Sequence, residues 1–121
     1  MENNEALKLI DKILNNLDKT GINSEALVED IKALRAYALE AQIPLVVKVL
    51  RLTYEHIEAT ESFMIPMLDY EPIDEEDGTV QSNDESSPVE SLKYLISLIK
   101  NLNNKVNIAD LKEYRDLLNS Y

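Results

Sequence analysis

Apolar residues recur every three or four positions along most of this chain, a spacing that predicts amphipathic helices rather than strands. Five stretches follow the pattern, at residues 4–18, 24–42, 44–65, 88–103 and 107–119. The first places Leu7, Ile10 and Leu17 on one face. The stretch 44–65 is the most apolar, so we expect it to be the central helix, touched on several sides. The pattern predicts an all-α fold.

Residues that favour helix ends mark several of the predicted boundaries. Gly21 follows the first stretch and suits a left-handed helix end, and Asn107 is a candidate N-cap of the fifth helix. Pro44 fits the first turn of the third helix, while Pro66 is expected to end or kink that helix, because the residue before a proline avoids the α region. Ser87–Glu90 forms a capping box with proline at the first helical position.

The length of 121 residues indicates a single helical domain over residues 1–121. The second and third helices are joined by only a few residues, so we expect them to be antiparallel neighbours. We predict a single five-helix bundle, with an antiparallel three-helix core and a C-terminal helical hairpin. Residues 69–86 lose the apolar pattern and are rich in Asp, Glu and Ser, which predicts an acidic flexible linker between the third and fourth helices.

The first and fourth helices resemble each other in sequence. Residues 5–17 align without gaps onto residues 90–102, with identical Glu, Leu, Lys, Asn and Leu at five positions. Two interpretations follow. The chain contains two copies of one helical hairpin on either side of the third helix, or the similarity is that of any two amphipathic helices of like composition.

The net negative charge is confined to one third of the chain. No Lys or Arg lies between Arg51 and Lys93, whereas twelve acidic residues fall there, and we call residues 52–92 the acidic segment. The rest of the chain carries eleven acids against twelve bases, so the formal charge of −11 arises in the acidic segment. Such a surface attracts cationic partners and repels the phosphates of nucleic acids.

Two sets of residues are candidates for partner binding. The first set consists of carboxylates in the acidic segment: Asp74, Glu75, Glu76, Asp77, Asp84 and Glu85. The second set is apolar and methionine-rich, at the end of the third helix: Phe63, Met64 and Met67. Methionine suits adaptable binding surfaces. For each set there is a plain alternative, a solvated spacer for the first and a cap on the core for the second.

The sequence offers no pattern for catalysis, a cofactor or a metal ion. It has no cysteine, which excludes thiol chemistry and thiolate metal sites. The one histidine, His56, has no companion ligand or nucleophile at motif spacing, and we expect it to have a structural or surface role. An EF-hand loop around Gly78 would begin at Ile73, where a ligating Asp is required. We therefore predict no catalytic, cofactor-binding or metal-binding residues.

These patterns favour a non-catalytic protein–protein interaction module, an adaptor, regulator or inhibitor that displays an acidic segment. The expected partner is another protein with a basic surface, and neither nucleic acid nor a membrane. The alternatives are a structural helical homo-oligomer and a small carboxylate-dependent enzyme. We expect a monomer or a homodimer. The N-terminus lacks the features of a secretory signal and no apolar run is long enough to span a membrane, so we expect a cytoplasmic protein.

Overall fold

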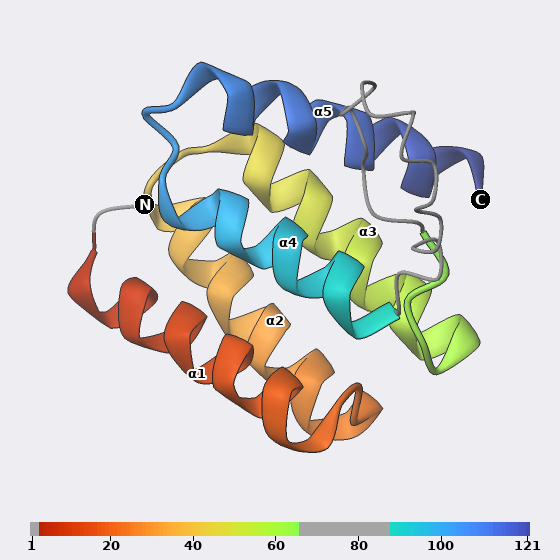
Figure 1. The fold of residues 1–121 in the computed structure, drawn as a ribbon. Coiled ribbons are helices and arrows are strands. Elements are labelled where there is room, and N and C mark those ends of the chain that lie inside the picture. Colours follow the sequence, from red (N-terminus) through yellow and green to blue (C-terminus); the bar gives the residue numbers. More distant parts are fainter. Residues whose placement is uncertain (1–2, 66–87) are drawn as a thin grey trace, which may run out of the picture.

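The computed structural model describes residues 3–65 and 88–121, and within them the chain forms α-helices and no strand (Figure 1). The helices are α1 (Asn4–Thr20), α2 (Ser24–Glu40), α3 (Pro44–Thr60), α4 (Pro88–Lys100) and α5 (Lys105–Ser120). The predicted all-α fold of five helices is confirmed. The predicted linker at residues 69–86 and Ser87 of the capping box lie outside the described residues.

The main packing contacts join the helices in a closed ring. α2 lies between α1 and α3, α5 packs on α3, and α4 packs on both α5 and α1 (Figure 1). The α4–α5 hairpin thus docks with one helix on each end of the row formed by α1, α2 and α3. Exchanging the α1–α2 hairpin for the α4–α5 hairpin leaves this pattern of neighbours unchanged.

Two ion pairs show that α1 and α4 run antiparallel. The Lys100 ammonium lies 2.8 Å from Asp11, and about two helical turns away Lys93 donates to Asp18. The hydrogen bond from Lys93 to Asp18 raises the pKa of Lys93. Because all four side chains reach solvent, these pairs align the two helices but add little to the free energy of unfolding.

α4 is the most buried helix of the bundle. Six of its 13 residues are buried, against six of the 17 in α3. α3 has two main neighbours, α2 and α5, as does every helix of the ring, so the structure does not single it out as the central helix. Leu92, Leu95, Ile96 and Ile99 follow the i, i+3, i+4, i+7 spacing of a single buried stripe, and the buried Leu98 widens this stripe on one side.

Several aligned positions of α1 and α4 are buried alike. Ile10 corresponds to Leu95 and Ile13 to Leu98, and all four side chains belong to the core. This burial pattern and the symmetric ring of neighbours agree with the internal alignment. The duplication itself stays a prediction, because two helices that face the same core share a burial pattern in any case.

α3 ends at Thr60 and not at residue 65 as predicted. The next residue, Glu61, adopts the left-handed conformation with φ 58°, and its amide donates to the carbonyl of Ile57. The helix is therefore closed well before Pro66, and Pro66 does not end it. The other helix ends lie within three residues of their predicted positions, which is the usual uncertainty of such boundaries.

α5 begins at Lys105, earlier than predicted, and its N-cap is Asn104 rather than Asn107. The side-chain oxygen of Asn104 accepts a hydrogen bond of 2.8 Å from the Val106 amide. Asn107 instead donates from its side-chain amide to the Asn101 carbonyl, at 2.9 Å. Both asparagines have the chemistry of a cap, and the geometry of the turn before α5 decides between them.

Gly21 closes α1 in a conformation that other residues avoid, with φ 72° and ψ −151°. We expect Gly21→Ala to lower the free energy of unfolding by about 1–3 kcal/mol. An added Cβ would meet only the Val89 side chain, at 3.8 Å, which is an ordinary contact. The cost is thus backbone strain and not a clash. Urea denaturation measures it, and a change below about 0.5 kcal/mol would contradict this explanation of the turn.

Candidate interaction surfaces

The structure describes two of the predicted partner-binding residues and separates them. Phe63 is buried in the core with 1% of its surface exposed, whereas its neighbour Met64 is 51% exposed. Met67 and the six candidate carboxylates of the acidic segment lie outside the described residues. Of the proposed apolar set, Met64 is thus the side chain that the described surface offers to a partner.

Phe63 belongs to an aromatic cluster between α3 and α5. Its ring meets the His56 ring edge-on, with centroids 5.6 Å apart, and lies 6.3 Å from the Tyr114 ring. The His56 ring also meets Tyr121 at 4.6 Å. Such contacts stabilise a core beyond the area they bury, so the chain after α3 is held by aromatic packing.

His56 holds the chain as it leaves α3. The Met64 amide donates a hydrogen bond of 2.9 Å to Nε2 of His56, and this places the proton of the neutral ring on Nδ1. His56 is 7% exposed, and its burial lowers the pKa of the imidazole. These observations explain why the helix ends early: the bond turns residues 61–65 back toward the core. They give His56 a structural role, one of the two that the sequence predicted.

The His56 geometry predicts a pH-dependent stability. Because the folded-state pKa lies below the ordinary value of about 6.5, the unfolded chain binds the extra proton first. The contribution of His56 is complete above about pH 6.5 and is lost as the pH falls from there toward the folded-state pKa. Urea denaturation between about pH 5 and 8 measures the difference between wild type and His56→Gln, which removes this titration. A difference that does not vary with pH would contradict the assignment.

A polar cluster joins α4 to α5. The Tyr94 hydroxyl donates to Oδ2 of Asp110 at 2.6 Å, and Asp110 is buried. Beside it the hydroxyls of Ser91 and Tyr114 lie 3.1 Å apart, and both are buried. A buried carboxylate is stabilised by such donors. The cluster therefore fixes the position of the two helices relative to each other.

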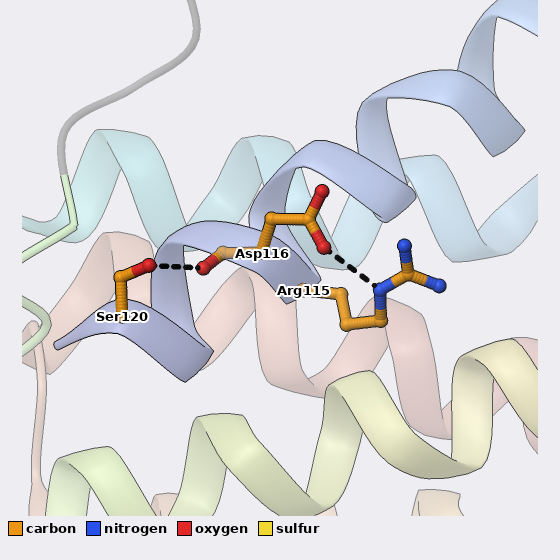
Figure 2. A network of polar contacts seen from close by, with 3 residues as sticks. All are labelled: Arg115, Asp116 and Ser120. Atoms are coloured by element: carbon orange, nitrogen blue, oxygen red, sulfur yellow. Dashed lines mark hydrogen bonds and ion pairs between the residues drawn. The ribbon is translucent and has the colours of Figure 1, made fainter.

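Near the C-terminus of α5, Figure 2 shows two local polar contacts between described residues. Nε of Arg115 lies 3.1 Å from Oδ1 of the adjacent Asp116, and the Ser120 hydroxyl donates to the Asp116 carbonyl at 3.0 Å (Figure 2). The first contact is solvent-exposed and contributes little, while the second satisfies a carbonyl in the last turns of the helix.

Four glutamates gather where α2 begins and α3 ends. A hollow of about 240 Å³ is lined by Glu25 and Glu29 of α2, by Glu58 of α3 and by Glu61, the residue that follows α3, together with Val28 and Lys32. We call it the acidic hollow. All four are exposed, and Lys32 lies 3.7 Å from Glu58. The acidic segment accounts for only two of these glutamates. The packing of α2 against α3 adds Glu25 and Glu29, which the charge pattern along the sequence did not indicate.

The opposite end of the α2–α3 hairpin is cationic. None of the described residues that line a groove of about 370 Å³ there is acidic, and we call it the cationic groove. Its lining residues are Arg35, Leu39, Gln42, Ile43, Pro44, Val47, Lys48 and Arg51. Along the sequence these bases are interleaved with acids and read as ordinary mixed surface. The sequence feature that could have indicated the groove is Leu39, an apolar residue that lies outside the predicted inward face of its helix.

Comparisons with protein-family models, curated proteins and solved structures found no significant match to this chain. Within residues 3–65 and 88–121, no cluster of three His, Cys, Asp or Glu side chains is arranged to hold a metal ion. In the same part of the chain, no helix has both the length and the apolar character to cross a membrane.

Proposed function

We propose that this protein is a non-catalytic protein–protein interaction module that binds a basic surface of its partner. The observation that carries the proposal is the acidic hollow, where α2 adds Glu25 and Glu29 to two glutamates of the acidic segment. The hollow borders the end of α3, and Glu61 is close in sequence to the point where the remaining acidic residues begin. At this end of the hairpin the hollow thus adds two glutamates of α2 to two glutamates of the acidic segment.

Exposure of the hollow supports charge attraction rather than catalysis. A carboxyl group that transfers protons at neutral pH is usually desolvated, so that its pKa rises. The four glutamates of the hollow are exposed. Exposed carboxylates of one sign raise the local concentration of cationic partners and speed their association. We include a cytoplasmic location and the absence of catalysis in this proposal.

Affinity enrichment from extracts of the native organism tests the proposal. The bait is the full chain, as wild type or with Glu25→Gln, Glu29→Gln and Glu61→Gln, which leave the Lys32–Glu58 pair in place. The matched control is Glu40→Gln, Glu55→Gln and Glu113→Gln, three exposed acids outside the hollow. We expect a basic protein that binds wild type and control at low salt and is released from the hollow variant. Equal recovery on all three baits would contradict a role for the hollow.

Sedimentation of the purified protein separates this function from the structural homo-oligomer. A stable oligomer needs an interface of roughly 1,000 Å² or more, and its assembly would not depend on a second protein. We expect the wild-type protein to sediment as one species whose mass does not change when the three glutamates of the hollow are neutralised. An assembly lost in the hollow variant would assign the hollow to self-association.

A further inference from the structure

The cationic groove combines free positive charge with an exposed apolar side chain. Arg35, Lys48 and Arg51 make no ion pair with any described residue, although acids outnumber bases in the described part of the chain. Leu39 in the same lining is 52% exposed. Charges that are separated from their opposites in this way leave a surface complementary to an anion with an apolar portion.

We propose that the cationic groove binds an acidic peptide segment of a partner protein, one that inserts a bulky apolar side chain between α2 and α3. The carboxylates of the segment lie against Arg35, Lys48 and Arg51. This binding site is separate from the acidic hollow. Lys48 and Glu58 are ten residues apart on α3, or about 15 Å along the helix axis. The groove and the hollow are therefore two separate surfaces, which contact different parts of a bound complex.

The apolar part of the lining is the reason to expect a bulky apolar side chain in the bound peptide. Leu39 comes from α2, Ile43 from the connection and Val47 from α3, so the groove follows the line where the two helices join. Its volume of about 370 Å³ falls in the range of ligand-binding clefts. An apolar group placed there removes exposed Leu39 surface from water, which a purely ionic ligand would not do.

Arg35 gives an independent reason to expect a carboxylate. Its Nε is buried and has no hydrogen-bond partner among the described residues. A buried donor without a partner costs free energy. The guanidinium group presents a planar pair of donors that matches a carboxylate in a bidentate contact. Because this Nε is shielded from solvent, a bound carboxylate reaches it when the Arg35 side chain turns toward the groove.

The charge of the whole chain favours a peptide over nucleic acid. The net charge of −11 repels any anion, but it repels a phosphate backbone, which is charged at every position, more strongly than a short segment with a few carboxylates. Three bases around one apolar floor match a short segment with a few carboxylates. A membrane surface likewise requires a wider basic face than this groove provides.

A selection from a displayed library of random peptides against the full-length protein tests the site. We expect enriched sequences that combine Asp or Glu with a bulky apolar residue. Fluorescence anisotropy with a synthetic copy of the leading peptide then compares wild type with Lys48→Gln/Arg51→Gln and with Leu39→Ser. We expect each variant to weaken binding about tenfold or more. The matched controls are Lys8→Gln/Lys112→Gln and Val106→Ser, exposed residues outside the groove that should leave affinity unchanged.

Several results would overturn the proposal. One is enrichment of peptides without acidic residues, and another is binding that survives the groove variants. Groove-dependent binding of duplex DNA or of anionic vesicles, without an enriched peptide, would assign the groove to those ligands. A dimer that the groove variants convert to monomer would assign it to a second copy of the chain. Loss of peptide binding in the variant that lacks Glu25, Glu29 and Glu61 charges would place the peptide at the acidic hollow instead.

Discussion

Phe63→Ala is expected to lower the free energy of unfolding by about 3–5 kcal/mol, the largest effect of any substitution considered. The ring is almost fully buried and contacts His56 and Tyr114. Its removal leaves a cavity between α3 and α5 and deletes the packing that holds the chain after Glu61. Urea or thermal denaturation measures the loss.

The neighbouring residue provides the control. Met64 is half-exposed, so Met64→Ala should change stability by no more than about 0.5 kcal/mol. The pair also separates folding from binding, since a partner that contacts this region meets Met64 first. Similar losses of stability for the two variants would mean that Phe63 is not packed as described.

Tyr94→Phe is expected to lower the free energy of unfolding by about 1.5–3 kcal/mol, the value for a hydrogen bond to a charged group. The substitution keeps the ring and removes the hydroxyl that donates to the buried Asp110 carboxylate at 2.6 Å. Chemical denaturation of the two proteins measures the difference. The same change at Tyr37, whose hydroxyl makes no hydrogen bond to a described residue, should cost less than about 0.5 kcal/mol. Equal effects at the two tyrosines would contradict a stabilising role for the α4–α5 cluster.

The sequence correctly predicts the positions of those helix ends that depend on local backbone chemistry. Pro44 begins α3 and Gly21 closes α1 at the expected residues, because both act through their own backbone. With ψ −151°, Gly21 does not adopt the left-handed α conformation that was expected of it. The end of α3 was predicted wrongly because it depends on a contact between His56 and Met64 and on the burial of Phe63. Periodicity reports which residues are apolar, and it does not report where a buried side chain accepts a bond from a later amide.

The candidate surfaces also differ in whether they depend on local sequence or on the packing of two helices. The charge pattern along the sequence reveals the acidic segment, because its residues are consecutive. The acidic hollow and the cationic groove each combine residues of α2 with residues of α3. Pairing the two helices antiparallel places Glu25 near Glu61 and Arg35 near Arg51, and this step requires the register of the hairpin. Short connections predict the pairing, whereas side-chain spacing alone does not fix the register.

The rate of association with the purified partner tests the central claim most directly. Stopped-flow measurements at about 20 and 300 mM salt compare wild type, the hollow variant and a variant with Asp74, Glu75, Glu76, Asp77, Asp84 and Glu85 changed to amides. We expect fast association of wild type at low salt, a steep fall with ionic strength, and slower association of both variants at unchanged stability. If the partner associates with all three proteins at one rate that does not depend on salt, acidic recognition is not the function of this protein.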